Sequence, residues 1–425
     1  MTLVESSVPD SESSVGRPTP ARRPVIALLA ANAISLVGNS LAALAIPWFV
    51  LITTGSAGKT GLVAFAQMLP TVLAAFFGGA LVDRMGAKRV SIIADIASSV
   101  AVALIPLLHH TVGLSFTLLV ILVFLGAVLD TPGGTARETL LPELVERAGM
   151  VLERANAASQ TIQSLANLIG PALAGVLIAW LGARNVLWVD AATFVVSSIL
   201  VATAVPSVSR RVKTSGRYFD ELMDGLRFLG RHQLLRTILI MAAILNFLMP
   251  ALFSVIMPVF AKEIFGRPES LGGILAGFGA GSLLGALAFG AMGPRLPRRT
   301  TLIGLLAVAC ISPAGLIALP PLLVVILLMG LLGFCAGAVN PLVFTVLQER
   351  APAELRGRVF GAVLAFVLIA APAGTLIAGL SLEVLSLRSV FIAITAIQAL
   401  VVVGLLFQPV LREMDQRPGT GGQLA

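Results

Sequence analysis

Long apolar runs recur along the whole chain, separated by short polar or charged segments. Each run is close to the roughly 20 residues that an α-helix needs to cross a hydrocarbon core of about 30 Å. Twelve such runs can be placed, at residues 25–52, 60–82, 89–108, 113–132, 157–181, 185–206, 235–261, 270–293, 300–319, 321–345, 357–381 and 388–408. The pattern predicts an all-α membrane protein with twelve transmembrane helices.

The composition agrees with this class. Hydrophobic residues make up 57% of the 425 residues and charged residues only 12%, far from the balance of a water-soluble domain. The first 24 residues are rich in Ser and Pro and include acids, so they lack the basic start and apolar core of a signal peptide. We predict a disordered cytoplasmic tail at 1–24 and a multi-pass protein of the plasma (inner) membrane.

The basic residues predict the orientation, because short cytoplasmic loops carry an excess of Lys and Arg. With twelve spans and both termini inside, 24 of the 29 Lys and Arg residues are cytoplasmic, and those outside are Lys59, Arg184, Lys262, Arg267 and Arg388. Topology therefore explains the net charge of +8. The basic residues are dispersed and lack interleaved aromatics, so we predict no nucleic-acid site.

The longest polar interior segment, residues 207–234, divides the spans into two groups of six. Within it, apolar side chains keep a helical spacing from Phe219 to Leu229, which predicts an amphipathic helix at the inner membrane surface. The expected domains are a bundle at 25–206, this linker, a second bundle at 235–408 and a cytoplasmic tail at 409–425. Paired six-helix repeats are typical of transporters that rock about a site between their halves.

One short loop carries a family pattern. The segment "GGALVDRMGAKRV" at 78–90 resembles the loop between the second and third helices of major facilitator superfamily transporters. Ala87 departs from the pattern, since a basic residue is common there. The residues that match are Gly79, Asp83, Arg84, Gly86, Lys88 and Arg89.

Two further segments narrow the resemblance. "LIGPALAG" resembles the fifth-helix motif of the superfamily's antiporters through Gly170, Pro171 and Gly175. "LDTPGGTARETLLPELVERAGMVLERANA" and "PAELRGRVFG" are similar to loops of the third drug:proton antiporter group, which includes the enterobactin exporter and macrolide efflux proteins. The resemblance covers residues 25–408. It implies export of hydrophobic or amphipathic small molecules, such as drugs, antibiotics, siderophore-like compounds or other secondary metabolites, by proton antiport with alternating access.

The resemblance also implies a conformational latch formed by the six matching residues of 78–90. In the family, the Asp at the position of Asp83 sits against the eleventh helix and stabilises the outward-open state. The corresponding segment of the second half, "GAMGPRLPRRTTL", has no Asp, so the latch is expected in the first half only. The alternative is that Asp83 caps a tight hairpin and the basic residues only fix topology.

Three of the 21 acidic residues, Asp95, Asp130 and Asp190, fall inside predicted spans, where charges are costly and often functional. Proton coupling needs a carboxylate that holds a proton when dry and releases it when open to water. Asp130 is the first candidate, with Arg137 seven residues on. Asp95 is the second, unless it only pairs with loop arginines. Asp190 is expected to pair with Arg184.

Polar and soft side chains on three helices predict a substrate cavity. Amides recur on one face of the first and fifth helices, and unsatisfied amides do not face lipid, so they line a cavity or join helices. The seventh helix adds aromatic side chains and two prolines able to kink it, Pro250 and Pro258. Bulky amphipathic molecules suit such a surface. The cavity candidates are Asn32, Asn39, Gln160, Gln163, Asn167, Asn246, Phe247 and Phe253.

Other function classes find little support. Three His and two isolated Cys predict no metal site and no cofactor, which disfavours a membrane enzyme; a receptor is a further remote alternative. "TTGSAGKT" lacks the first Gly and the preceding strand of a phosphate-binding loop, which disfavours ATP as the energy source. A proton-coupled importer of a small metabolite remains the competing interpretation. The expected partners are a small-molecule substrate, protons and the lipid bilayer, and the expected state is a monomer.

Overall fold

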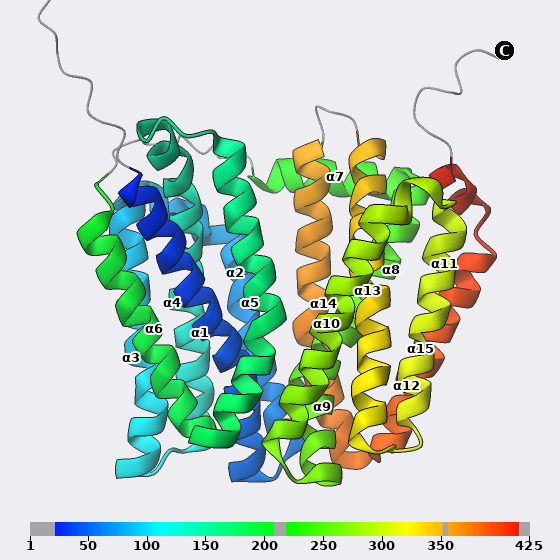
Figure 1. Cartoon of the computed structure of the whole chain (residues 1–425), viewed down its shortest axis with the longest axis horizontal. Helices are drawn as coiled ribbons and strands as arrows, with labels where there is room; N and C mark the ends of the chain where they lie inside the picture. Colours follow the sequence, from blue (N-terminus) through cyan, green and yellow to red (C-terminus); the bar gives the residue numbers. More distant parts are fainter. Residues whose placement is uncertain (1–21, 208–217, 352–355, 416–425) are drawn as a thin grey trace, which may run out of the picture.

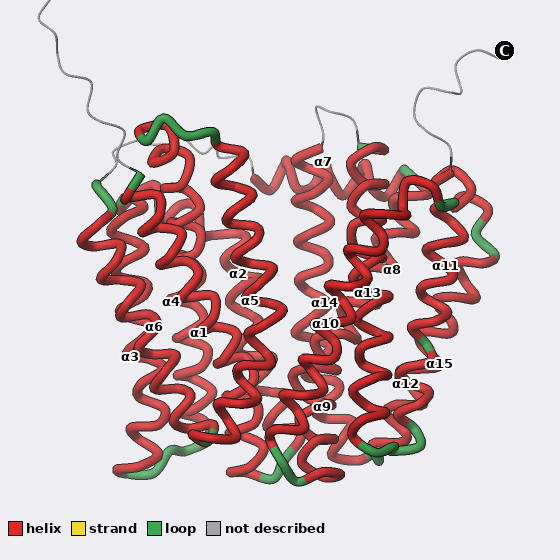
Figure 2. The backbone as a smooth tube through the Cα atoms, viewed as in Figure 1, coloured by secondary structure: helices red, strands yellow, loops and turns green. Residues whose placement is uncertain are grey.

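The computed structural model describes residues 22–207, 218–351 and 356–415, and within these ranges the backbone is helix and loop with no strand (Figure 2). The first half contains α1 (Arg23–Thr54), α2 (Ala57–Met85), α3 (Ala87–Thr111), α4 (Phe116–Arg147), α5 (Leu152–Leu181) and α6 (Ala183–Ala204). A shorter helix, α7 (Tyr218–Arg231), follows. The second half contains α8 (Gln233–Ala251), α9 (Met257–Phe260), α10 (Pro268–Met292), α11 (Arg298–Ala309), α12 (Ile311–Leu316), α13 (Leu322–Arg350), α14 (Arg356–Val384) and α15 (Leu387–Leu406).

Most of these helices are long enough to cross a membrane. Among the described residues, 11 helical segments are both long and apolar enough for this. The remaining long helix is α2, with 29 residues, of which the side chains at 73–84 lie outside the described part. The structure is thus an all-α membrane protein, as predicted, and its helices are consistent with twelve spans.

Glycines let consecutive helices turn back within one or two residues. Gly86 alone separates α2 from α3 and has a φ of 85°, and Gly182 alone separates α5 from α6 with a φ of 79°. A side chain with a Cβ would be strained at both positions. These turns are therefore set by single residues and hold the neighbouring helices antiparallel.

The seventh span is one continuous but irregular helix from Gln233 to Phe265. It contains two π-helical turns, Leu252–Ile256 and Ala261–Phe265, that flank the short segment α9. Proline removes a backbone donor and disturbs the regular ladder, and Pro250 and Pro258 lie two and three residues before these irregular turns. The helix is thus irregular around the two prolines that the sequence marks as able to kink it.

The two halves stand side by side, with the start of α1 and the final 3-10 turn, Pro409–Asp415, on the same side of the molecule (Figure 1). We call this the terminal side, and the opposite one the far side. α7 also lies on the terminal side, whereas the α1–α2 and α5–α6 turns lie on the far side (Figure 1). Because α7 leads directly into α8, both halves begin on the terminal side.

Among the described residues, the buried apolar cluster that joins the two halves lies on the far side. The largest cluster combines first-half residues such as Trp48 and Phe194 with second-half residues such as Phe260 and Phe391. On the terminal side, the buried clusters of the described residues each belong to one half: Leu28 and Leu144 lie in one, and Leu234 and Leu411 in another. The hydrophobic contact that holds the halves together is thus concentrated at the far side.

Two glycine pairs bring helices of opposite halves into backbone contact. A Cβ added to Gly175 of α5 would overlap the Cα of Gly272 in α10. A Cβ added to Gly61 of α2 would lie 2.7 Å from the Cα of Gly379 in α14. Small residues at helix crossings allow such close approach. The far-side interface therefore depends on the absence of side chains at these positions.

Polar contacts also join the two halves on the far side. Glu383 of α14 accepts hydrogen bonds from Ser56 Oγ at 2.5 Å and from the backbone N of Gly58 at 2.7 Å. The carboxylate thereby caps the N-terminus of α2, where unpaired N–H groups and the helix dipole favour an anion. Lys262 also donates to the carbonyl oxygen of Leu51 across the halves at 2.9 Å. These contacts add polar links between the halves on the far side.

Candidate functional site

A buried ion pair lies at the centre of the first half. Arg137 Nη1 of α4 donates to Asp95 Oδ1 of α3 at 2.7 Å, and the two side chains are 4% and 0% exposed. This agrees with the alternative that Asp95 pairs with an arginine outside the predicted spans: the fourth span was predicted to end at 132, but α4 continues to Arg147 and includes Arg137. Because both charges are shielded from water, each depends on the other.

Further hydrogen bonds surround this pair. Asp95 Oδ2 accepts from Ser197 Oγ of α6 at 2.7 Å. Arg137 Nε donates to Asn32 Oδ1 and its Nη2 donates to Ser35 Oγ, both of α1 and both at 3.2 Å. The amide of Asn32, predicted to line a cavity, therefore belongs to a network that joins α1, α3, α4 and α6.

Asp130 lies one to two turns away on the same helix as Arg137. Its Oδ1 is 4.0 Å from Arg137 Nη2, and its Oδ2 accepts a hydrogen bond from Asn39 Nδ2 of α1 at 2.9 Å. The carboxyl side chain is 22% exposed and lines a pocket of about 220 Å³ enclosed by α1, α2, α3, α4 and α6. We call this the first-half pocket. Asp130, the first candidate for the proton carrier, therefore lies in the wall of this pocket.

Asp190 of α6 lines the same pocket. The prediction that it pairs with Arg184 is wrong: within the described part of the chain, neither carboxyl oxygen has a hydrogen-bond partner, and the residue is 1% exposed. It faces α1, where a Cβ added to Gly38 would lie 2.6 Å from Asp190 Oδ1. Arg184 follows the far-side turn at the start of α6, six residues and more than one helical turn away.

The charges of this region do not balance if all groups are ionised. Asp95 and Arg137 neutralise one another, and Asp130 and Asp190 then remain as two further carboxyl groups in one pocket. Buried charges without a partner are costly, whereas a neutral acid is tolerated. Binding and release of protons is therefore chemistry that this pocket can perform.

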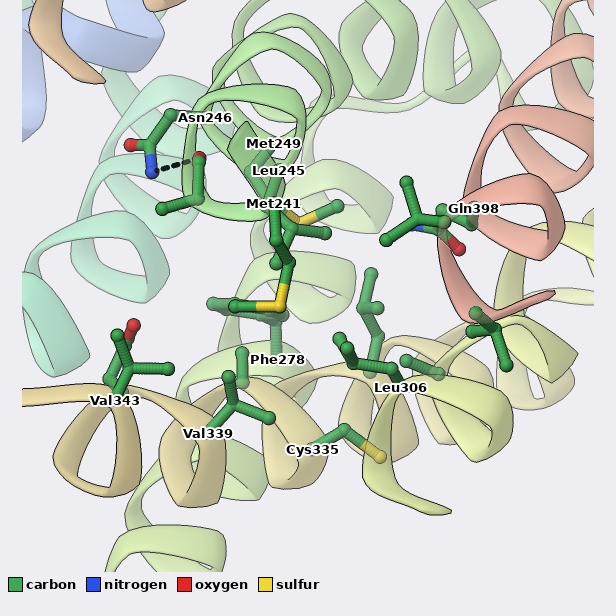
Figure 3. Close-up of a pocket in the computed structure, with 17 residues that line it drawn as sticks. Met241, Leu245, Asn246, Met249, Phe278, Leu306, Cys335, Val339, Val343 and Gln398 are labelled. Carbon is green, nitrogen blue, oxygen red and sulfur yellow. Dashed lines mark hydrogen bonds between the residues drawn. The ribbon is translucent and has the colours of Figure 1, made fainter. Parts of the chain in front are cut away.

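The second half contains a pocket of a different kind, with a volume of about 260 Å³ (Figure 3). We call it the second-half pocket; it is enclosed by α8, α10, α11, α13 and α15. Its walls are mostly apolar, and its polar side chains are Asn246, Asn340 and Gln398, with Cys335 as a thiol. Asn246 Nδ2 donates to the carbonyl oxygen of Ala242 at 3.0 Å. Sequence reasoning found Asn246 and missed Gln398, although Gln398 is the only amide side chain between residues 390 and 407.

Of the other cavity candidates, Asn39 of α1 lines the first-half pocket, whereas the two phenylalanines line neither pocket. Phe253 packs edge-on against Phe278, with ring centroids 4.5 Å apart, so it supports the pocket wall without lining it. Phe247 packs against the far-side apolar cluster. Gln160 is exposed and Gln163 is half-buried with a polar partner, while the side chain of Asn167 lies outside the described residues. Of the fifth-helix candidates whose side chains are described, Gln160 and Gln163 line neither pocket in this conformation.

The fifth-helix motif provides close packing. A Cβ added to Gly170 would overlap Ser40 of α1, and Gly175 contacts Gly272 of α10. Pro171 lies between them within α5. The motif thus lets α5 approach a helix of its own half and a helix of the other half.

The loop between α2 and α3 is described only in part. Gly79 and the side chains of Asp83 and Arg84 lie within the stretch 73–84, whose surroundings are outside the described part of the chain. Gly86 forms the turn, Arg89 is exposed, and Lys88 Nζ donates to the carbonyl oxygen of Ala202 at the end of α6 at 2.9 Å. A cation at a helix C-terminus is favourable, and this contact joins two helices of the first half.

Comparison with known proteins decides the family. The family model described as Major Facilitator Superfamily matches residues 28–364 and 239–423. The chain belongs to this superfamily. Major facilitator proteins are membrane transporters of small molecules and not enzymes, and this chain is accordingly a multi-pass transporter.

Relatives of this major facilitator protein point to efflux. The chain is 34% identical over 401 residues to the multidrug efflux pump Tap of Mycolicibacterium fortuitum, covering 93% of this chain and 98% of the relative. It is 24% identical to macrolide efflux protein A of Streptococcus pyogenes, covering 83% and 87% of the two chains. The crystal structure of the nucleoside transporter NupG has the same fold, with a TM-score of 0.70, 12% identity and coverage of 90% and 98%. The predicted resemblance to drug-efflux members of the superfamily is confirmed.

Proposed function

We propose that the protein exports hydrophobic or amphipathic small molecules in exchange for protons, with Asp130 as the main proton carrier. The observation that carries the proposal is the placement of this carboxyl group. It lies in a pocket of the first half, beside a buried Arg137–Asp95 pair that already has its own partners. The similarity to the multidrug efflux pump Tap supports export as the direction.

The mechanism follows from alternate exposure of this pocket. When the pocket is closed to water, a carboxyl group retains its proton, and when it opens to water at lower proton concentration, the proton is released. Arg137 Nη2 is 4.0 Å from Asp130 Oδ1 on the same helix and is held by Asn32 of α1 and Asp95 of α3. Movement of α1 or α3 relative to α4 would therefore change this separation and couple it to proton release. Rocking of the halves about their interface would expose the pockets to each side in turn.

The conformation described here supports alternating access. Its halves meet through glycine contacts and the Glu383 cap on the far side, while buried clusters on the terminal side stay within single halves. We propose that the terminal side is cytoplasmic, so this state faces inward. Fusion of a reporter that matures only in the cytoplasm to the C-terminus tests that orientation, and an inactive fusion contradicts it.

The same proposal assigns the α2–α3 loop to the opposite state. Gly79, Asp83, Arg84, Gly86, Lys88 and Arg89 would form a latch that stabilises the outward-open conformation, by resemblance to the superfamily pattern. A single chain contains both halves, so we further propose that the monomer is the working unit.

Asp130→Asn tests the proton assignment. The purified protein is reconstituted into vesicles with an imposed pH gradient, and accumulation of ethidium is followed by fluorescence. We expect the variant to lose gradient-driven accumulation, by tenfold or more, because an amide cannot exchange the proton. Exchange of ethidium without a gradient should persist, since the carboxamide keeps the size and a hydrogen-bonding oxygen for Asn39.

The matched control is Glu153→Gln, a change of the same chemistry at an exposed acid in the first turn of α5. It should retain wild-type accumulation. Gradient-driven accumulation at the wild-type rate in Asp130→Asn would remove Asp130 from the mechanism, and no accumulation by the wild-type protein would reject proton-driven export of this dye.

A further inference from the structure

The second-half pocket contains a buried polar atom without a partner. Gln398 of α15 is 5% exposed, and within the described part of the chain its Oε1 accepts no hydrogen bond. Its side chain lines the pocket, on the side formed by α15 (Figure 3). An amide oxygen left unpaired in an apolar setting is costly, which favours a donor that enters the pocket.

The two pockets occupy equivalent places in the two halves. The lining positions of α4 (123, 126, 127, 130 and 131) have the same spacing as five lining positions of α13 (332, 335, 336, 339 and 340). Positions 190 and 194 of α6 likewise have the spacing of 398 and 402 of α15. In this register Gln398 corresponds to Asp190 and Val339 to Asp130. The second half thus has a neutral acceptor and a valine where the first half has its two acids.

The remaining lining residues define what fits. Asn246 and Asn340 are the more accessible polar residues, whereas Cys335, Leu332 and Gln398 are buried. The pocket lining contains Met241 and Met249, whose flexible thioethers adapt to different apolar shapes. No charged residue lines the pocket, and its volume of about 260 Å³ suits one ring system better than a whole drug-sized molecule.

We propose that the second-half pocket holds the uncharged aromatic part of an amphipathic substrate, and that Gln398 selects substrates by accepting a hydrogen bond from an N–H or O–H group on that part. The inference rests on the proposed export function, because it assigns the substrate class for the same transport cycle. Protons then bind in the first-half pocket and the substrate in its second-half equivalent. The two ligands therefore need not compete for one group.

A pair of fluorescent probes tests this selection. N-phenyl-1-naphthylamine is uncharged and has one N–H donor, and its N-methyl derivative has none. Both are titrated onto the purified full-length protein in detergent, without any pH gradient. We expect the wild-type protein to bind the N–H probe about three- to tenfold more tightly than the methylated probe, as one net hydrogen bond allows.

Gln398→Leu should bring the two affinities to within about a factor of two, whereas Gln233→Leu, at the exposed start of α8, should leave the preference unchanged. If Gln398→Leu fails to fold, Ala336→Leu serves instead, because it narrows the pocket without altering Gln398; it should weaken both probes at least threefold. An unchanged preference in Gln398→Leu, or unchanged affinities in Ala336→Leu, would overturn the proposal.

Transport is measured separately, so the two proposals can fail independently. A wild-type protein that discriminates between the probes through Gln398, yet moves neither against a pH gradient, would retain the pocket and reject proton-driven export. A protein that exports the N–H probe with no dependence on Gln398 would retain export and reject this pocket as its site.

Discussion

The two halves of the molecule share one arrangement of helices and have opposite interiors. In the first half, Asp95, Arg137 and Asp190 are buried, and the side chain of Asp130 is 22% exposed. In the second half, the buried polar residues among those described are uncharged: Ser270, Ser312, Thr375 and Gln398. The second half has its clearest ion pair at the terminal end, where Arg298 and Glu349 are 26% and 30% exposed.

This difference suggests why a transporter benefits from two similar halves. Proton exchange requires carboxyl groups held in fixed positions away from water, which a network of hydrogen bonds provides. Recognition of varied apolar molecules requires adaptable side chains and few fixed charges. When each half supplies one of these environments, movement of one half relative to the other can link them.

The largest expected effect concerns the buried pair. Arg137→Met leaves Asp95 buried without its cation, and we expect the free energy of unfolding to fall by about 3–5 kcal/mol. Arg298→Met breaks the partly exposed pair of the second half and should cost about 1 kcal/mol or less. Thermal and denaturant unfolding of the purified variants in detergent measure both. Equal losses would show that the two interiors do not differ as described.

The next effect concerns where the halves touch. Gly175→Val inserts a side chain into the contact with Gly272, and overpacking of this kind costs about 1–3 kcal/mol. We expect the far side to open, shifting the conformational equilibrium by about five- to hundredfold. Distances between spin labels at positions 180 and 385, both exposed and in opposite halves, report this shift.

Gly134→Val is the matched control, because a Cβ at Gly134 of α4 meets nothing within 4 Å. Unchanged distances in Gly175→Val would mean that the glycine contact does not set the conformation. The same labels test the proposed latch, since Asp83→Asn should shift the distances in the opposite sense, toward a closed far side.

The smallest expected effect separates two acids of the first half. Asp190 has no hydrogen-bond partner within the described residues, so Asp190→Asn should change the free energy of unfolding by less than about 1 kcal/mol or raise it. Asp95→Asn should lower it by several times as much, because Arg137 then loses its counter-charge. Unfolding measurements that rank the two variants in the reverse order would contradict this distinction.

Hydrophobic run lengths were sufficient to predict the helical membrane fold, because most spans are separated by short turns, such as those at Gly86 and Gly182, or by charged segments. They were not sufficient for the pairing of buried acids. Asp95 and Arg137 are 42 residues apart, and their contact depends on how α3 packs on α4. Asp190 was assigned to the charge nearest in sequence, yet helix geometry separates the two. The unpaired oxygen of Gln398 and the place of this side chain in a pocket wall are likewise features of helix packing that the sequence does not reveal.

The far-side glycine pairs have a mechanical consequence. At Gly175 and Gly272, and again at Gly61 and Gly379, two backbones meet with no interlocking side chains between them. Separation at these two points needs no change of rotamer, so the resistance to opening comes from the far-side apolar cluster around them and from the polar links, among them Glu383. The two halves can therefore separate at these points without rearranging side chains, and a single added methyl group would be enough to shift the equilibrium between closed and open states of the far side.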